Sequence, residues 1–130
     1  MEILFDTHIL LWALDDSSAL PEAARKLILS PDTEPLFSAA SIWEIAIKRA
    51  KGSSDFQFDP SVVRAALLRS GYVELPIGSP AGIFAGSLPP HHKDPFDRIL
   101  IGQAIEHGCT LVTHDGHMAK YATVAPIKMV

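Results

Sequence analysis

Short apolar stretches alternate with longer amphipathic ones along the whole chain, and this alternation is the feature that most limits the fold. Residues 2–5 and 110–113 have the composition of short strands. In the segments between strands, apolar residues recur at helical spacing, most clearly in 95–107. Strands that alternate with helices form parallel βαβ units. We therefore predict an α/β fold in three layers, α/β/α, with a mainly parallel central sheet of about five short strands.

The remaining element boundaries follow from turn and capping residues. Ser41 has the spacing of an N-cap with Glu44 in capping-box position, and Asp94 precedes Pro95 as a cap precedes the first helical residue. We expect strands at residues 2–5, 36–39, 72–75, 110–113 and 126–129. We expect helices at residues 7–14, 21–29, 41–51, 60–70, 79–87 and 95–107, and a short one near 117–121.

Size and composition describe one ordinary domain, which we place at residues 1–130. The chain has 48% hydrophobic and 20% charged residues, as globular proteins do. No apolar run approaches the ~20 residues that span a bilayer, and Cys109 is the only cysteine. The first residues enter a strand directly, without a basic leader. We therefore expect a cytoplasmic protein that has no disulfide and no membrane partner.

Acidic residues follow the predicted strands or begin the predicted helices. Asp6 follows the first strand and Asp115 follows the fourth, while Glu44 and Asp97 lie in the first turns of helices. In an open parallel sheet, functional groups gather beyond the carboxyl ends of the strands. The N-terminus of each of those helices also lies near this edge. Four carboxylates from four separate segments are therefore expected to converge there.

A cluster of four carboxylates repels itself unless cations compensate the charge. Mg²⁺ and Mn²⁺ prefer carboxylate oxygens and retain water and substrate phosphates in their coordination shells. Such a site suits phosphodiester hydrolysis better than zinc peptidase chemistry. The net charge of −4 argues against non-specific binding of nucleic acid, but bound cations would weaken that objection.

Each acid also has a purely structural interpretation. Asp6, Asp94 and Asp97 could cap helices or complement helix dipoles, and Asp94 is better explained as a cap than as a ligand. Glu44 could pair with Lys48 one helical turn later. Asp115 precedes Gly116 in a common turn dipeptide. No acid is persuasive alone, so the metal hypothesis depends on their common position after successive strands.

The acidic segments resemble those of PIN domains, specifically VapC-type toxins of bacterial type II toxin–antitoxin pairs. The matching segments are Phe5-Asp6-Thr7-His8, Ser41-Ile42-Trp43-Glu44-Ile45-Ala46-Ile47-Lys48, His91-His92-Lys93-Asp94-Pro95-Phe96-Asp97-Arg98 and Leu111-Val112-Thr113-His114-Asp115. They occur in the family's order, and the second and third are fairly specific. His114 is a departure, because many relatives carry an arginine before the last aspartate.

The resemblance implies a Mg²⁺- or Mn²⁺-dependent endoribonuclease that acts by metal-activated water. Its catalytic and metal-binding acids would be Asp6, Glu44, Asp97 and Asp115. Thr7 and Thr113 would support them by hydrogen bonding. Candidate RNA contacts are Lys48, Arg49, Arg98 and His92. The resemblance also implies a small antitoxin partner and a homodimer or a toxin–antitoxin hetero-oligomer.

Two other classes with a similar fold remain as alternatives. A receiver-like Mg²⁺-binding signalling module needs an aspartate at the end of the third strand, and residues 72–76 contain none. It also needs a lysine after the last strand, whereas Lys128 lies within that strand. An aspartyl-phosphate phosphatase needs a second aspartate two residues after the first, where this chain has His8. The nuclease is therefore the preferred interpretation.

Overall fold

The computed structural model describes residues 1–54 and 56–130 and contains a five-stranded sheet in which all neighbouring strands are parallel. The strand order is β3-β2-β1-β4-β5. The strands are β1 (Glu2–Phe5), β2 (Glu34–Ser38), β3 (Val73–Leu75), β4 (Thr110–Thr113) and β5 (Ile127–Met129). The chain runs outward from β1 to β3, then crosses back to add β4 beside β1. The switch point of the sheet therefore lies between β1 and β4.

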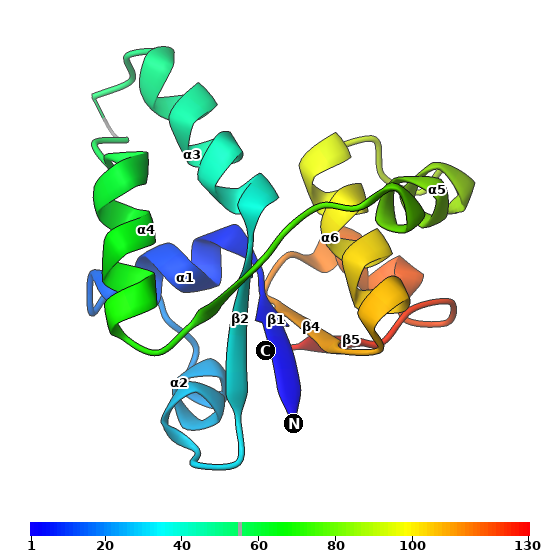
Figure 1. Ribbon diagram of the computed structural model, residues 1–130, viewed down its shortest axis with the longest axis horizontal. Helices are drawn as coiled ribbons and strands as arrows, with labels where there is room; N and C mark the ends of the chain where they lie inside the picture. The colour runs from blue at the N-terminus through cyan, green and yellow to red at the C-terminus, as the bar shows by residue number, and fades with distance from the viewer. Residues whose placement is uncertain (55) are drawn as a thin grey trace.

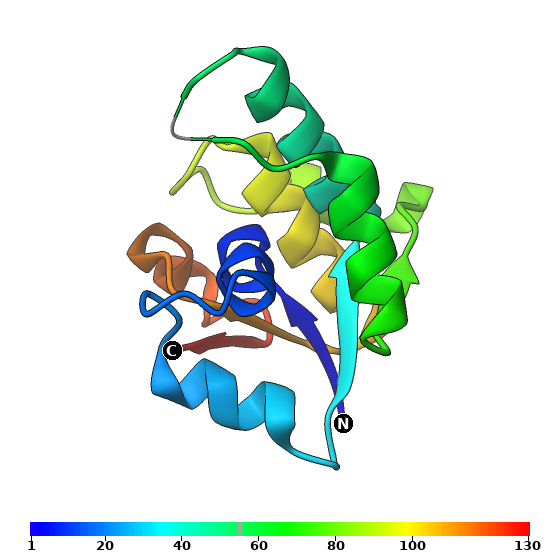
Figure 2. The same ribbon diagram turned by 90° about the vertical axis from the view of Figure 1, so that its left-hand side faces the viewer.

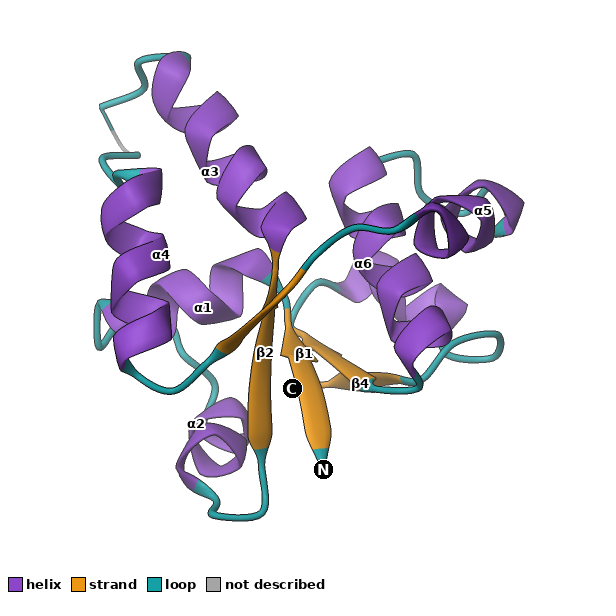
Figure 3. Cartoon of the chain, in the orientation of Figure 1, coloured by secondary structure: helices purple, strands orange, loops and turns teal. Residues whose placement is uncertain are grey.

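Helices cover both faces of the sheet, which confirms the three-layer α/β prediction. The helices are α1 (Thr7–Leu14), α2 (Glu22–Leu29), α3 (Ala39–Ala50), α4 (Pro60–Arg69), α5 (Ser79–Ser87), α6 (Pro95–His107) and the 3₁₀ helix η1 (Gly116–Tyr121). Figure 1 shows α1, α2 and α4 on one side and α5 and α6 on the other, and Figure 2 shows the first group from the front. Helix α3 continues from β2 beyond the carboxyl ends of the strands (Figure 3).

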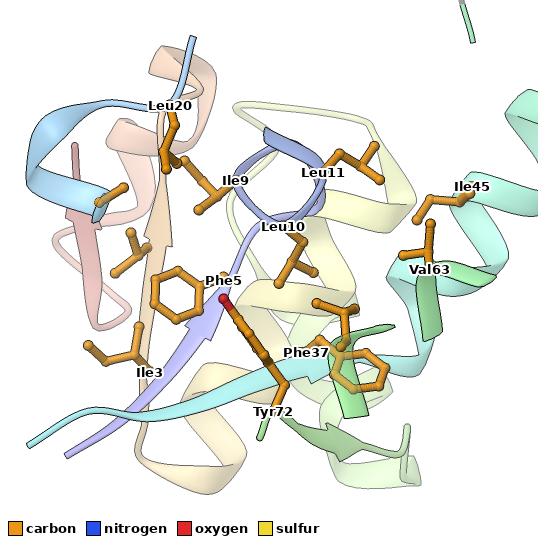
Figure 4. Packing of buried hydrophobic residues seen from close by; sticks show 13 residues of the cluster. Ile3, Phe5, Ile9, Leu10, Leu11, Leu20, Phe37, Ile45, Val63 and Tyr72 are labelled. Carbon is orange, nitrogen blue, oxygen red and sulfur yellow. The ribbon is translucent and has the colours of Figure 1, made fainter. Parts of the chain in front are cut away.

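Alternate residues of the strands fill two separate cores. Ile3 and Phe5 of β1 point to the α1–α2–α4 side, and Leu4 between them points to the α6 side. On the first side the sheet packs against Leu10 of α1 and Leu67 of α4, and Figure 4 shows much of this cluster. Strands β1 and β4 lie inside the sheet, and helices bury both of their faces. This burial fixes the register of the two strands, and therefore the positions of Asp6 and Asp115 beyond their ends.

Helices α5 and α6 approach each other unusually closely at Gly102. A Cβ atom built at Gly102 would lie 2.2 Å from the carbonyl oxygen of Ala81 in α5. Only glycine permits this approach without a shift of the backbone. The close packing fixes α6, whose first turn carries Asp97.

The observed elements agree with the predicted ones except at the start of α3 and the strand before it. Helix α3 begins at Ala39, and Ser38 is its cap, because the Ser38 side chain accepts a hydrogen bond from the Ala40 N–H at 3.0 Å. Ser41 lies inside the helix, so the predicted capping box with Glu44 is wrong. Asp94 caps α6 as predicted, through 2.9 Å and 3.4 Å hydrogen bonds from Phe96 and Asp97. Across the described residues, no helix combines the length and apolar character needed to cross a membrane.

Candidate metal centre

Asp6 lies at the carboxyl end of β1, beside the switch point of the sheet. Its side chain is 4% exposed and accepts two hydrogen bonds. The Thr7 N–H donates to Oδ1 at 2.7 Å, and the Thr113 hydroxyl at the end of β4 donates to Oδ2 at 2.6 Å. Asp6 is therefore both the cap of α1 and the link between the two central strands.

Glu44 projects from α3 toward the first turn of α1. The Thr7 hydroxyl donates to Glu44 Oε1 at 2.7 Å and also lies 2.8 Å from the Ser41 hydroxyl. The Lys48 ammonium lies 3.0 Å from Glu44 Oε2, as expected for residues one helical turn apart. Glu44 is only 7% exposed, so the ion pair and the hydroxyl compensate a nearly buried charge.

Asp97 occupies the first turn of α6 and is 8% exposed. His92 Nε2 lies 2.7 Å from Asp97 Oδ2. This contact joins the carboxylate to the loop that precedes the helix. Asp94 lies on the same loop, and one ligand atom from each of these three residues falls within 4.8 Å of the others.

His92 is held in place by a network around Arg98. The Arg98 guanidinium donates to the His92 carbonyl at 3.1 Å and to the Tyr121 hydroxyl at 3.2 Å. It also donates to the carbonyls of Ala85, Leu88 and Pro89. Tyr121 completes the network by accepting from the His92 N–H at 2.8 Å. Arg98 and His92 were predicted as RNA contacts, but both side chains make contacts within the protein, and we do not retain them as proposed RNA contacts.

Asp115 lies two residues beyond β4 and is more exposed than the other three acids, with a side chain 37% exposed. It caps η1, because Oδ1 accepts from the His117 N–H at 2.9 Å and lies 3.1 Å from His117 Nδ1. The His117 ring stacks on that of His92, with centroids 5.2 Å apart and planes 4° apart. Asp115 and Asp6 line the same hollow of about 230 Å³.

The charges of these acids interact across the site. Burial is the main cause that raises the pKa of Asp97 to about 7; the hydrogen bond from His92 opposes this rise. The negative charge of Asp6 also raises the pKa of Asp97. Burial likewise raises the pKa of Asp6, against the hydrogen bond from Thr113, and the charge of Glu44 adds to that rise. The carboxylate of Asp6 therefore interacts electrostatically with both Glu44 and Asp97.

Each of the four acids has its own partner within the protein. Thr113 donates a hydrogen bond to Asp6, and Lys48 forms an ion pair with Glu44. The rings of His92 and His117 lie within hydrogen-bond distance of Asp97 and Asp115, respectively. Among the described residues, the His92–Asp94–Asp97 group alone brings three metal-ligand side chains within 4.8 Å. The acidic site fits a hard divalent cation, because Asp6 and Asp97 are buried carboxylates with raised pKa values, and a bound cation would relieve the repulsion between them.

The structure adds His92, Asp94 and His117 to the surroundings of the predicted acids. Sequence reasoning treated Asp94 as a cap and His92 as a candidate RNA contact, and it gave His117 no role in the site. The signal was weak: His92 and Asp97 are five residues apart, which does not place them together before the path of the loop is known. Asp115 and His117 share one short turn. Their contact is linked to Asp97 only because the His117 ring stacks on the His92 ring, which in turn contacts Asp97.

The sequence profile of the PIN domain family matches residues 3–124, so the chain belongs to the PIN domain family. PIN domains are nucleases, and membership therefore places the chain in a class of hydrolases. None of the curated protein sequences matches it.

Solved structures with the same fold come from toxin–antitoxin complexes. A chain of VapBC2 from Rickettsia felis, bound to a DNA fragment from the promoter, is 16% identical with a TM-score of 0.68, and the match covers 100% of this chain and 98% of that one. A toxin–antitoxin complex from Klebsiella pneumoniae gives 18% identity and a TM-score of 0.67, with coverage of 98% and 96%. VapBC-1 from nontypeable Haemophilus influenzae gives 21% identity and a TM-score of 0.65, and the match covers 99% of this chain and 98% of that one. At these identities the likeness concerns the fold.

Proposed function

We propose that the chain is a metal-dependent endoribonuclease, the toxin of a type II toxin–antitoxin pair. The observation that carries the proposal is the gathering of buried carboxylates around Asp6 at the switch point of the sheet: the charge of Glu44 raises the pKa of Asp6, and the charge of Asp6 raises the pKa of Asp97. Neither a receiver module nor an aspartyl-phosphate phosphatase is supported by the family match. The full-length likeness to chains of VapBC complexes supports the toxin assignment.

In the proposed site, Asp6 and Asp97 hold Mg²⁺ or Mn²⁺, and Asp115 and Glu44 complete the acidic surroundings. A cation bound there supplies an activated water and neutralises charge on the scissile phosphate. Thr113 and Thr7 support the acids: the first fixes one oxygen of Asp6, and the second orients Glu44. The rigid strand ends and helix starts hold these groups before substrate arrives, so little reorganisation is needed.

The proposed substrate is RNA, and two cations on α3 are its candidate contacts. Lys48 lies 3.0 Å from Glu44 Oε2, so its ammonium is already beside the acidic site. Arg49 lies 2.8 Å from Asp59 Oδ2, and its side chain is half exposed. RNA phosphate can therefore reach Lys48 directly and competes with Asp59 for Arg49.

The proposed partner is a small antitoxin, and the proposed setting is the cytoplasm. Several apolar residues in and between α1 and α2 lie in the core, including Leu10, Leu11 and Leu20. Leu29 at the end of α2 and Val62 on α4 stay exposed, at 74% and 61%, on the side that these helices cover. We propose that this surface receives an amphipathic antitoxin segment, in a homodimer or a hetero-oligomer.

RNA cleavage by the purified protein tests the proposed function. Protein freed of any inhibitor should cut single-stranded RNA in Mg²⁺ or Mn²⁺ and stop when EDTA is added. Asp97→Asn should lose at least about 100-fold in rate, because loss of a residue that only orients a metal ligand already costs about 10- to 100-fold, and Asp97 is proposed to bind the metal itself. Cleavage that persists in EDTA, or an Asp97→Asn variant with full activity, would exclude the metal site.

A further inference from the structure

A hollow of about 470 Å³ lies beside Glu44, between α3 and the start of α6. Its lining residues are Glu44, Ile47, Lys48, Lys51, Lys93, Asp94, Pro95 and Phe96. The hollow is distinct from the one that Asp6 and Asp115 line, and Glu44 connects it to the acidic site. Its walls come from α3, which carries Glu44, and from the loop that carries His92 and leads into α6.

The hollow concentrates positive charge in an acidic protein. The chain has a net charge of −4 and only six lysines, of which Lys48, Lys51 and Lys93 line this one hollow. Lys51 and Lys93 are exposed, and within residues 1–54 and 56–130 neither forms an ion pair within 4.0 Å. Three of the five arginines, by contrast, pair with acids: Arg25, Arg49 and Arg64.

The acids in the same hollow are already compensated. Glu44 Oε2 pairs with Lys48, and Asp94 Oδ1 accepts the N–H groups at the start of α6. Among the residues that the structure describes, the charges in the hollow that lack an ion-pair partner are therefore those of Lys51 and Lys93. Such a surface attracts an anion that extends away from the acidic site, such as the phosphates of a polynucleotide chain.

An aromatic pair borders the lysines, and one of its two rings, that of Trp43, is exposed. A second hollow of about 470 Å³ shares Ile47, Pro95 and Phe96 with the first, and Trp43 also lines it. Trp43 is 62% exposed, and its ring meets the Phe96 ring edge to face, with centroids 5.2 Å apart. Lysines beside exposed aromatic rings are the combination with which proteins bind single-stranded nucleic acid, through phosphate contacts and base stacking.

We propose that the two hollows form a binding track for single-stranded RNA that leads away from the cleavage site. Lys51 and Lys93 contact phosphates next to the scissile one, and Trp43 with Phe96 receives a base. The choice of RNA rests on the proposed function. The track selects single strands, because a base paired in a duplex has no free face for Trp43.

The salt dependence of binding tests the phosphate contacts. The probe is a short fluorescein-labelled oligouridine in EDTA, so that anisotropy reports binding without cleavage. Each phosphate contact on single-stranded nucleic acid contributes about 0.7 to the slope of log K against log salt. Lys51→Ala and Lys93→Ala should each reduce the slope by about that amount, and the double variant by about twice as much. Lys26→Ala, on exposed α2, is the matched control and should leave the slope unchanged. Equal slopes in all variants would overturn the phosphate contacts.

Variants of Trp43 distinguish a contact with an RNA base from an interface between protein chains. Trp43→Ala should weaken oligouridine binding by roughly fivefold or more without changing the salt slope, because stacking carries no counterion release. Trp43→Phe should keep most of the affinity. If Trp43→Ala instead dissociates a dimer on gel filtration and binds RNA like the wild type, the aromatic hollow joins two protein chains and the base contact is wrong.

Hydrolysis of bis(p-nitrophenyl) phosphate with Mn²⁺ distinguishes failure of the track from failure of the proposed function. This small ester needs the acidic site but not the track, so the Lys51→Ala/Lys93→Ala variant should hydrolyse it like the wild type. Ester hydrolysis combined with lysine-independent RNA binding would overturn the track alone. Lysine-dependent RNA binding without any phosphodiesterase activity would support the track and exclude the nuclease.

Discussion

At the scale of single residues, Asp97 couples the site to pH. Its pKa rises from 3.8 to about 7 on folding, chiefly through burial, so the folded state binds more protons than the unfolded state between these values. The stability of the metal-free protein should therefore fall as the pH rises from about 4 to about 7 and change little from this cause above 7. Urea unfolding in EDTA at a series of pH values measures the fall. In Asp97→Asn it should be smaller, and at pH 8 this variant should be at least as stable as the wild type.

Asp6 contributes to the same pH dependence, since burial raises its pKa too. The informative quantity is therefore the difference between wild type and Asp97→Asn at each pH. A difference that stays constant from pH 4 to pH 8 would show that Asp97 ionises normally. A loss of more than ~2 kcal/mol in Asp97→Asn at pH 8 would show that its carboxylate mainly stabilises the start of α6.

His92 should matter for cation affinity through Asp97. Its ring fixes one oxygen of that carboxylate, and partners of this kind typically change metal affinity by about 10- to 100-fold when removed. We expect His92→Ala to bind Mn²⁺ at least about tenfold more weakly in calorimetric titration. His91→Ala is the matched control, because the His91 ring contacts Tyr121 and not an acid. Equal affinities in the two variants would contradict this role of His92.

At the scale of elements, the contact of α5 with α6 supports the position of Asp97. Gly102→Ala places a methyl group against the Ala81 carbonyl and should destabilise the protein by about 1–3 kcal/mol, the usual cost of overpacking. Gly82→Ala and Gly86→Ala are controls within α5, where an added Cβ meets nothing within 4 Å. They should stabilise by up to about 1 kcal/mol through helix propensity. Chemical denaturation measures all three, and a neutral Gly102→Ala would contradict the close packing.

The elements also show how far sequence reasoning reaches. Strands β1 and β4 and helix α6 were predictable because their signals are local: short apolar runs, the Asp94-Pro95 start and Gly108, which adopts a positive φ of 66° at the end of α6. The start of α3 could not be predicted in this way, because Ser38 and Ser41 are both residues that commonly cap a helix. Tertiary contacts decide between them, since the Ser41 hydroxyl lies against Thr7 of another element.

The same distinction applies to the candidate site. All four of its acids could be placed near one edge of the sheet from the succession of strands and helices alone. The partner of Glu44 could also be predicted, because Lys48 lies one helical turn away. The partner of Asp97 could not, because the position of His92 depends on contacts with Arg98 and Tyr121, and Tyr121 lies 29 residues from His92. The paired His92 and His117 rings likewise depend on contacts between segments far apart in the sequence.

At the scale of the whole molecule, the proposed toxin should act on a cell. Expression of the chain alone should arrest growth, because free nuclease degrades RNA, and co-expression of the proposed small antitoxin should restore growth. Asp6→Asn alone should be harmless while remaining folded, since the substitution removes a buried charge rather than a packed side chain. Colony counts and circular dichroism measure the two properties. Normal growth with the soluble wild-type chain would contradict the toxin proposal.

The most direct test of the metal-dependent site is a paired titration in one preparation. Mn²⁺ is added to metal-free protein, and both bound Mn²⁺ and the initial rate of RNA cleavage are measured at each concentration. If the carboxylates around Asp6 hold the cation on which cleavage depends, both curves should have the same midpoint, and Asp97→Asn should lose both while staying folded. Cleavage that is complete before Mn²⁺ binds, or Mn²⁺ binding that survives in Asp97→Asn with unchanged affinity, would contradict the proposed site.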